Sequence, residues 1–346
     1  MIFMYLPKSP LELSIQLTTH CNISCLHCIA EASVNGNSTS IPHDRMQLLI
    51  DEAQFIGVST LDLSGGEPLL YDGFFDICEY VLSKKFNVSF VTNGLLIPKG
   101  MKSLSRILKK YGNQLGIGVS LDGPSPESHG YFRPEDTFDP AIEAIIMLRE
   151  AGANVSVSCV LNKINIRLIP EFLTFLSSIG ISDIGFFPFM PLGRGEQFEN
   201  EVLSSKAIHT FLKKKDSWNK VYKGNIGFKM PWEFLFLEYE KKYAGPCEAG
   251  YTRLWVNSRG EVTPCASMID VIIGNINHDS ISKIWHNSPV LKNLRDPFLL
   301  KGTCSSCQYR NGCRGGCRGL AYLMEGDYLC SDPYCPIVVQ NKKVQA

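Results

Sequence analysis

The spacing of cysteines is the feature that most constrains how this chain can fold. Of its 13 cysteines, Cys21, Cys25 and Cys28 form the pattern C-x3-C-x2-C just after an apolar alternation at residues 11–17. Thiolates are soft ligands that suit iron-sulfur clusters, and a fully ligated 4Fe-4S cluster takes four of them. Three therefore leave one iron open for a small molecule. A zinc half-site and a set of buried apolar thiols are the alternatives that the triplet alone leaves open.

A double glycine follows a strand-like segment at residues 61–64. Gly65 and Gly66 let the backbone approach a ligand closely, so the loop that they form with Glu67 and Pro68 can offer peptide groups to a bound ammonium. An ordinary strand-to-helix turn would use the same residue types. The position of this loop downstream of the cysteine triplet favours a ligand-binding role.

Two more strand-like segments end on polar residues followed by a glycine. One ends on Thr92 and Asn93, and the other ends on Ser120 and Asp122. In open α/β sheets, ligands bind beyond the carboxyl ends of the strands, where such residues gather. Each of these residues could equally cap a helix.

A second group of cysteines occupies the C-terminal third of the chain. Its centre has the spacing C-x2-C-x5-C-x3-C over residues 304–317, and further cysteines lie on either side. A zinc ribbon is the alternative, because C-x2-C knuckles are common zinc ligands. The positions in the pattern are Cys247, Cys265, Cys304, Cys307, Cys313, Cys317 and Cys335.

Together these motifs resemble the radical S-adenosylmethionine (SAM) superfamily with a C-terminal SPASM domain. That extension carries auxiliary clusters in anaerobic sulfatase maturases, the pyrroloquinoline quinone biosynthetic enzyme, and peptide- or tetrapyrrole-modifying relatives. The resemblance covers residues 11–337. It implies that Cys21, Cys25 and Cys28 hold the catalytic 4Fe-4S cluster, whose open iron is chelated by SAM. It also implies a radical SAM oxidoreductase or maturase that cleaves SAM to a 5'-deoxyadenosyl radical, which removes a substrate hydrogen.

The resemblance further implies which residues bind SAM. His27 stands where the family commonly has an aromatic residue that places backbone against the adenine, and an imidazole can still present its ring. The implied cofactor-binding residues are His27, Gly65, Gly66, Glu67, Pro68, Thr92, Asn93, Ser120 and Asp122.

The C-terminal cysteines are expected, by the same resemblance, to hold two auxiliary clusters. The outer cluster would use Cys304, Cys307, Cys313 and Cys335, and the inner cluster Cys247, Cys265 and Cys317. The inner set lacks a fourth cysteine. An open iron, a ligand other than cysteine, or Cys330 could complete it. Cys330 could also replace Cys335 in the outer set, but the Asp-Pro-x-Cys context of Cys335 matches the family.

Two cysteines belong to neither pattern. Cys78 lies in an amphipathic helical run, and Cys159 alternates with Val155 and Val157 in a predicted strand. Both are predicted core residues, because free cysteine is among the most buried residue types.

Charge and hydropathy argue against several classes of function. The 34 basic and 34 acidic residues balance, so the chain carries no electrostatic footprint for nucleic acid. It has no apolar run long enough to span a membrane and no secretory signal at its start. We expect a soluble, cytoplasmic protein, in which 13 cysteines indicate metal binding rather than disulfides.

Hydrophobic periodicity predicts an α/β fold: a partial (β/α)6 TIM-like barrel followed by a Cys-rich auxiliary-cluster domain. Helical periodicity fills the gaps between strands, for example at 45–55 and 141–149. The predicted domains are a barrel at 11–190, a bridging segment at 191–243, and a SPASM domain at 244–337. Strands are predicted near residues 13–18, 60–64, 88–92, 115–121, 155–161 and 184–188.

The resemblance favours oxidative modification of a ribosomal peptide or of a peptide-derived cofactor precursor. Oxidation or epimerisation of a small molecule, a tetrapyrrole side chain or a carbohydrate, is the alternative, and a zinc-stabilised binding protein is the non-enzymatic one. Only about ten residues precede the first strand, so we expect any precursor peptide to need a separate leader-binding protein. The electron donor would be a low-potential protein of the flavodoxin or ferredoxin type. No nucleic-acid or membrane partner is expected.

Overall fold

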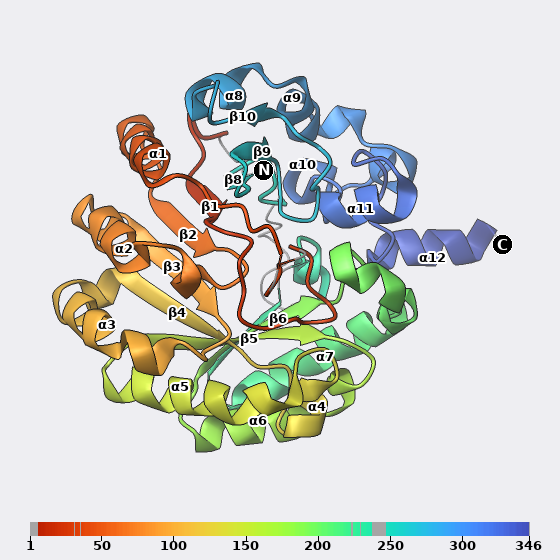
Figure 1. Cartoon of the computed structure of the whole chain (residues 1–346). Helices are drawn as coiled ribbons and strands as arrows, with labels where there is room; N and C mark the ends of the chain where they lie inside the picture. Colours follow the sequence, from red (N-terminus) through yellow and green to blue (C-terminus); the bar gives the residue numbers. More distant parts are fainter. Residues whose placement is uncertain are drawn as a thin grey trace.

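A curved, largely parallel sheet wrapped on its outside by helices forms the body of the protein (Figure 1). The computed structural model describes residues 6–30, 32–34, 36–222, 224–228, 230–236 and 247–345, with only the backbone for 342–345. The strands that run parallel in chain order are β1 (Glu12–Gln16), β2 (Thr60–Ser64), β3 (Asn87–Thr92), β4 (Leu115–Ser120), β5 (Asn154–Leu161), β6 (Asp183–Pro188) and β7 (Asn225–Phe228).

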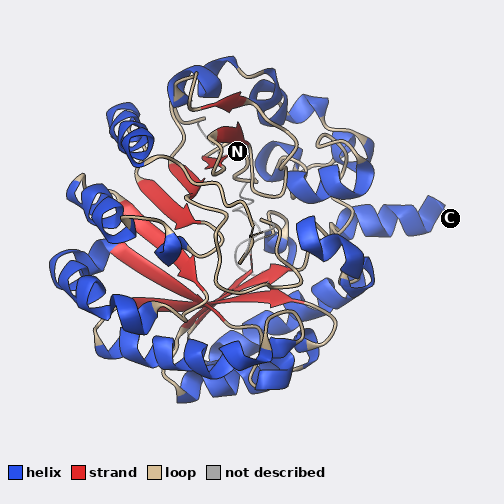
Figure 2. Cartoon of the chain, in the orientation of Figure 1, coloured by secondary structure: helices blue, strands red, loops and turns tan. Residues whose placement is uncertain are grey.

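The six predicted strands are confirmed, with ends that differ by no more than two residues. Helices alternate with them, as the predicted β/α units require (Figure 2). The helices around the sheet are α1 (His43–Ile56), α2 (Phe74–Ser83), α3 (Ile97–Tyr111), α4 (Pro126–Gly130), α5 (Phe138–Glu150), α6 (Ile169–Ser178) and α7 (Ser205–Tyr222).

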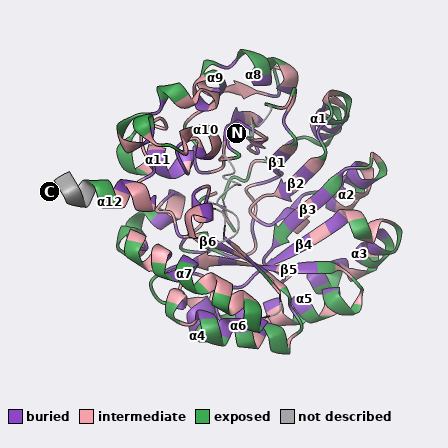
Figure 3. Cartoon of the chain, turned by 180° about the vertical axis from the view of Figure 1, so that it is seen from behind, coloured by how far each residue is buried: buried purple, intermediate pink, exposed green. Residues whose placement is uncertain are grey.

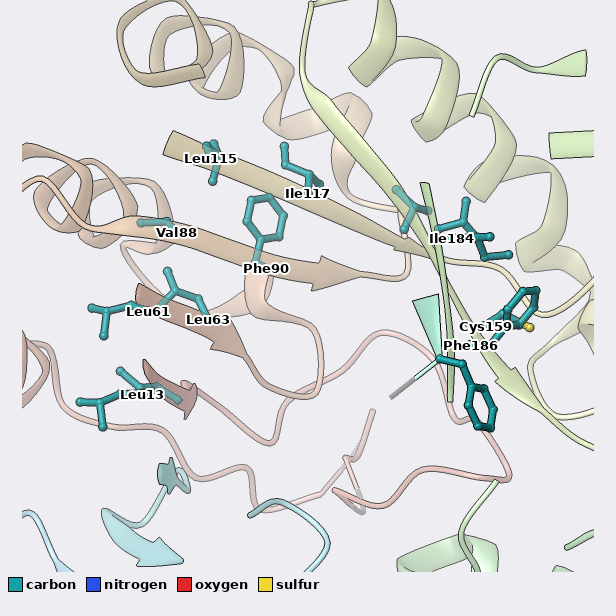
Figure 4. Packing of buried hydrophobic residues seen from close by; sticks show 14 of the residues in the cluster. Leu13, Leu61, Leu63, Val88, Phe90, Leu115, Ile117, Cys159, Ile184 and Phe186 are labelled. Carbon is teal, nitrogen blue, oxygen red and sulfur yellow. The ribbon is translucent and has the colours of Figure 1, made fainter. Parts of the chain in front are cut away.

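Alternate side chains of the strands build the core between sheet and helices. Strand register places Leu13, Leu61, Val88 and Leu115 in one row across β1 to β4, and Figure 4 shows this row packed side by side. All four are at most 3% exposed. Intervening residues such as Gln16 face the barrel interior instead. This alternation is why the strands could be located from sequence.

The helices are amphipathic: their buried residues face the sheet and their exposed residues face solvent (Figure 3). Cys78 on α2 and Cys159 on β5 are fully buried, which confirms both as core residues. No helix of the described residues is long and apolar enough to cross a membrane.

The sheet continues past the predicted strands at both edges. β7 pairs with β6, while β8 (Arg253–Val256) pairs in parallel with β1 and leads into β9 (Glu261–Thr263) and β10 (Gly274–Asn275). An ion pair of 2.8 Å between Arg253 Nε and Glu12 Oε1 joins β8 to β1. The C-terminal region is thereby built onto the barrel sheet. These strands have two to four residues each, too few for a periodicity signal.

The rest of the C-terminal region consists of short helices beside the open side of the barrel, with the last helix extending away from the body (Figure 1). The proposed domain boundaries remain predictions, and residues 237–246, which span the boundary at 243, lie outside the described residues. The helices are α8 (Ile281–Asn287), α9 (Pro289–Arg295), α10 (Arg310–Cys313), α11 (Arg318–Glu325) and α12 (Pro336–Gln345).

Packing of the core generates a stability prediction. Phe90 is fully buried on β3, whereas Phe55 on α1 is 91% exposed, so the pair separates burial from residue type. We expect Phe90→Ala to lower the free energy of unfolding by about 3–5 kcal/mol, and Phe55→Ala to change it by less than about 0.5 kcal/mol. Anaerobic urea denaturation followed by circular dichroism measures both. Similar losses in the two variants would contradict the assignment of this core.

Candidate active site

A pocket of about 680 Å³ opens at the carboxyl ends of the barrel strands. It is lined by the loop after β1, by the ends of β2 to β6, and by residues of the C-terminal region. Ligand sites of parallel sheets lie in this position, and the volume is in the range of small-molecule sites, about 300–1,000 Å³.

The predicted cysteine triplet lies in this pocket. Cys21, Cys25 and Cys28 all line it, and they pack with Ile23 and Ala32 in a small cluster separate from the main core. Burial raises the pKa of Cys21 to about 11 and also raises that of Cys25. Both thiols therefore need a bound cation to become thiolates near neutral pH.

The donor set fits an iron-sulfur cluster. Three thiols of one short loop share the pocket, and Arg133 Nη1 and Asn93 Nδ2 lie 3.8 Å and 3.9 Å from the sulfurs of Cys25 and Cys21. Such donors stabilise sulfur ligands that carry negative charge. No three His, Cys, Asp or Glu side chains of the described residues are arranged for a single metal ion.

The double glycine packs directly against the cysteine loop. Gly66 N donates to Thr18 O at 2.7 Å, and Glu67 N donates to His20 O at 2.8 Å. A Cβ on Gly66 would lie only 2.4 Å from His20 O, so no larger residue fits without moving the backbone. Gly65 and Gly66 both line the pocket. The loop predicted to bind a ligand thus also fixes the position of the cysteine loop.

Glu67 is placed behind the pocket rather than in it. Its carboxylate is 1% exposed and accepts hydrogen bonds from Thr92 Oγ1 at 2.7 Å, Asn93 N at 2.9 Å and Leu69 N at 3.3 Å. Burial raises its pKa to about 7, although these hydrogen bonds oppose the rise. Pro68 is also buried outside the lining. Their predicted cofactor-binding roles stay predictions, and the geometry supports an indirect one, in which Glu67 orients Thr92 and Asn93.

Asp122 is likewise buried, and it holds an arginine that the sequence analysis missed. Its Oδ2 lies 2.6 Å from Arg133 Nε, and its Oδ1 accepts from Val160 N at 2.8 Å. Burial alone would raise the pKa of Asp122, but the positive charge of Arg133, the neighbouring histidines and the hydrogen bond from Val160 N together hold that pKa below its ordinary value. Arg133 and Ser120 line the pocket, whereas Asp122 lies beneath. No motif marks Arg133, because its partner is 11 residues away.

His27 lines the pocket with little exposure. Its ring centroid is 5.2 Å from that of Phe132, and its Nε2 is 3.5 Å from Arg133 Nη2. Burial lowers its pKa to about 4, so the imidazole is neutral near pH 7. Its Nδ1 has no hydrogen-bond partner among the described residues. A buried ring nitrogen without a partner beside the cysteine loop fits a polar ligand such as a nucleobase.

Arg194 connects the cysteine loop to the segment after β6. Its Nε donates to Cys25 O at 2.9 Å, its backbone N donates to Cys28 O at 3.2 Å, and its Nη1 donates to Ala32 O. Arg194 also lines the pocket. Arg194, which stands between two glycines, therefore fixes the position of the loop that carries the triplet.

The C-terminal cysteines separate in space into the two predicted groups. One small cavity is lined by all four predicted outer ligands, together with Trp232 and Tyr309. Burial raises the pKa of Cys313 and of Cys335 to about 12. The four cysteines of this cavity are Cys304, Cys307, Cys313 and Cys335.

Cys247, Cys265 and Cys317 form the second group. Burial is the main cause of the raised pKa of Cys317, and the charges of the other two thiols add to it, which places all three together. Ser267 Oγ lies 3.3 Å from Cys265 Sγ. Cys317 also lines the large pocket, so this inner group borders the space above the amino-terminal triplet.

Cys330 lies outside both groups. Its charge acts on Lys301, whose pKa is raised mainly by Asp327 and to a smaller extent by this thiol. It does not line the cavity of the outer four. This placement favours Cys335 over Cys330 as the outer ligand and leaves the fourth position of the inner group without a cysteine in the described residues.

Comparison with known proteins supports the same assignment. Residues 15–176 match the model of the radical SAM superfamily, and residues 247–308 match that of the SPASM iron-sulfur cluster-binding domain. The AdoMet-dependent heme synthase of Methanosarcina barkeri is 30% identical over 95% of this chain and 97% of its own length. The mycofactocin maturase MftC of Mycobacterium tuberculosis is 26% identical over 94% of this chain and 83% of its own.

A solved structure shows the same fold. SuiB of Streptococcus suis, solved with S-adenosylmethionine and with precursor peptide SuiA, has a TM-score of 0.76, 21% identity and coverage of 95% of this chain and 76–78% of its own. The chain belongs to the radical SAM superfamily and carries a SPASM domain. It is an enzyme that binds SAM and a 4Fe-4S cluster, with auxiliary iron-sulfur clusters in its SPASM domain. The zinc-stabilised binding protein is thereby set aside, and the predicted α/β class is confirmed.

Close packing at Gly66 predicts that an added methyl group displaces the cysteine loop. Gly66→Ala should lose the iron of the amino-terminal site, because the new Cβ overlaps His20 O. Gly116→Ala is the matched control, since a Cβ there meets nothing within 4 Å. Iron content and the visible spectrum after anaerobic reconstitution measure the loss. Full iron content in Gly66→Ala would show that the loop contact is not needed.

The positions of Cys330 and Cys335 predict that their removal affects iron content differently. Cys335→Ala should lose iron from the outer site, whereas Cys330→Ala should keep the iron content of the parent, because only Cys335 lines the shared cavity. Iron analysis with electron paramagnetic resonance (EPR) of the reduced clusters distinguishes them. Loss in Cys330→Ala alone would reverse the ligand assignment.

Proposed function

We propose that this enzyme oxidises a peptide, either a ribosomal product or the precursor of a peptide-derived cofactor. One observation carries the proposal: a single pocket is lined by all three amino-terminal cysteines and by Cys317 of the inner auxiliary group. A substrate in that pocket would contact the site where the radical forms and a site that accepts an electron.

The residues on the barrel side of the pocket would hold and orient SAM. Cys21, Cys25 and Cys28 would ligate the cluster, which, when bound, supplies the electron that cleaves SAM to methionine and the 5'-deoxyadenosyl radical. Arg133 offers a cation to the carboxylate end of SAM, and His27 offers its free Nδ1 to the adenine end. Holding SAM at both ends would limit the substrate carbons from which a hydrogen atom can be removed.

The cysteines on the opposite side would hold the auxiliary cluster that accepts the electron that the substrate loses. Loss of a hydrogen atom to the radical, then of one electron to the inner site and one proton to solvent, amounts to a two-electron oxidation. Cys317 borders the pocket, so the electron would leave through the group that it forms with Cys247 and Cys265.

Exposed apolar side chains line the same pocket. Val91, Phe187 and Ile269 line it and are 39–41% exposed. They would cover an apolar side chain and exclude water from the carbon that reacts. Relatives named mycofactocin maturase and bacteriocin biosynthesis protein support a peptide as the molecule that carries this side chain.

Oxidation of a tetrapyrrole side chain is the second candidate. It is favoured by the heme synthase of M. barkeri, which is 30% identical and aligns over nearly its entire length. Arg259 and Trp255 on the C-terminal wall could hold a propionate and a macrocycle respectively.

The partners are proposed with the reaction. A low-potential donor of the flavodoxin or ferredoxin type would reduce the amino-terminal cluster, and a separate protein would bind the leader of a precursor peptide. None of the 13 cysteines forms a disulfide, which supports a reducing cytoplasm as the setting.

Turnover with candidate substrates tests the proposal. Reconstituted enzyme would be mixed with SAM, dithionite and either a short peptide encoded beside its gene or a propionate-bearing iron porphyrin. We expect the peptide to lose two hydrogen atoms by mass spectrometry and to stimulate release of 5'-deoxyadenosine. Turnover of the porphyrin alone would establish the second candidate.

Removal of one inner ligand should uncouple the two halves of the reaction. Cys265→Ser should still release 5'-deoxyadenosine but form little oxidised product, because the substrate radical lacks its electron acceptor. Cys330→Ser is the control, since Cys330 lies outside both groups. Product at the parent rate in a folded Cys265→Ser variant that retains the amino-terminal cluster would rule out the electron-transfer role.

A further inference from the structure

A buried amide side chain at the end of β1 is hydrogen-bonded at only one of its two ends. Gln16 is 6% exposed and lines the large pocket. Its Oε1 accepts a hydrogen bond from Ser258 N at 3.2 Å. Its Nε2, which carries two N–H donors, has no hydrogen-bond partner among the described residues. An unpaired donor in a buried side chain is destabilising, so a glutamine at this position indicates a partner that the chain itself does not supply.

The orientation of the Gln16 side chain is fixed by the C-terminal region. A backbone N–H can only donate, so the Gln16 atom that faces Ser258 N is the oxygen, and the NH2 group is left for the pocket. Ser258 is itself held, because its Oγ lies 2.5 Å from Thr39 Oγ1, and Thr39 N donates to Thr19 Oγ1 at 2.9 Å. The donors of Gln16 are therefore in place before a ligand binds, which lowers the entropic cost of binding.

A second polar side chain with open hydrogen-bonding capacity lies on the neighbouring strand. Ser64 is the register partner of Gln16 on β2 and lines the same pocket. In the part of the chain that the structure describes, its hydroxyl makes no hydrogen bond. Neighbouring strands lie about 4.8 Å apart, and a hydroxyl can accept as well as donate. Gln16 and Ser64 thus offer a donor and an acceptor side by side, which matches the C=O and N–H groups of a peptide main chain.

The charges near Gln16 favour a neutral oxygen as its partner. Gln16 and Ser64 are both uncharged. Arg259, which follows Ser258, has its Nε and Nη2 each 3.2 Å from Glu261 Oε2, so its guanidinium is already paired. A carboxylate is bound most strongly by a cation, above all by a bidentate guanidinium, whereas an amide carbonyl needs only an N–H donor. These side chains therefore suit an amide carbonyl better than a carboxylate.

We propose that Gln16 is a specificity-determining residue of this enzyme, whose NH2 group donates to a main-chain carbonyl of a peptide substrate. The inference rests on the proposed peptide oxidation and deepens it, because it names a group that selects a peptide. Gln16 ends the strand that leads into the cysteine triplet, so a carbonyl bound there is held in the pocket that the triplet shares with the inner group. Val91, Phe187 and Ile269 would then cover the neighbouring side chain, as apolar pocket walls do around a few orienting polar groups.

Peptide binding to the reconstituted full chain tests the proposal. The probe is the short peptide encoded beside the gene, titrated anaerobically by calorimetry with SAM present and no reductant. Gln16→Glu keeps the size of the side chain and an oxygen that accepts from Ser258 N, but it replaces the NH2 donors by an acceptor. We expect the Kd for the peptide to rise about tenfold or more, and the Kd for SAM to stay within about twofold of the parent. Gln54→Glu is the matched control, because Gln54 Nε2 donates to Lys84 O at an exposed position outside the pocket lining.

A second variant removes the donors without adding a charge. Gln16→Met should show the same loss of peptide affinity with the iron content of the parent. Unchanged peptide affinity in either variant with full iron content would overturn the proposal. An equal loss of SAM affinity would assign Gln16 to the cofactor, and loss of iron in both variants would assign it to the cysteine loop. Either result would also overturn the proposal.

The same titrations separate this inference from the proposed function. If the parent binds a propionate-bearing iron porphyrin and no peptide, the proposed peptide oxidation fails, and this inference fails with it. If the parent binds the peptide and both Gln16 variants bind it equally well, only the role of Gln16 is wrong.

Discussion

Parallel pairing of β1 on both of its edges is the constraint on which the rest of the structure depends. β2 pairs with one edge and β8 with the other, so the barrel and the C-terminal region share one strand. The cysteine loop begins directly after this strand. Gln16 at its end accepts from Ser258 N at 3.2 Å, and both residues line the pocket. The pairing of β1 with both neighbours therefore places the triplet between the barrel and the auxiliary groups.

Buried polar groups then set the shape of the pocket floor. The Asp122–Arg133 pair is nearly inaccessible, with side chains 1% and 10% exposed. Removing one partner of such a pair typically costs about 3–5 kcal/mol, because the other charge is left buried alone. The buried Glu67 carboxylate accepts hydrogen bonds from Thr92 and Asn93 at the end of β3. Asp122 and Glu67 do not line the pocket, yet they hold Arg133 and Thr92, which do.

Much of this arrangement could be predicted from the sequence, because its signals are local. Alternation of Leu13 and Ile15 locates β1, and fixed spacing identifies Cys21, Cys25 and Cys28 as one set. What the sequence could not reveal depends on contacts between distant segments. Arg194 reaches the cysteine loop across 169 residues, and Trp232 reaches Asp332 across 100. Cys330 shows the same limit: the sequence favoured Cys335 as the outer ligand but left Cys330 as an alternative, and the fold shows that only Cys335 lines the cavity of the outer four.

Three separate cysteine groups would each hold one cluster, with the pocket between the first and the second. Anomalous diffraction at the iron edge from an anaerobic crystal grown with SAM tests this arrangement. We expect three iron sites: one beside the amino-terminal triplet, one beside Cys247, Cys265 and Cys317, and one in the cavity of the outer four. Iron at the triplet alone, or zinc at either C-terminal group, would contradict it.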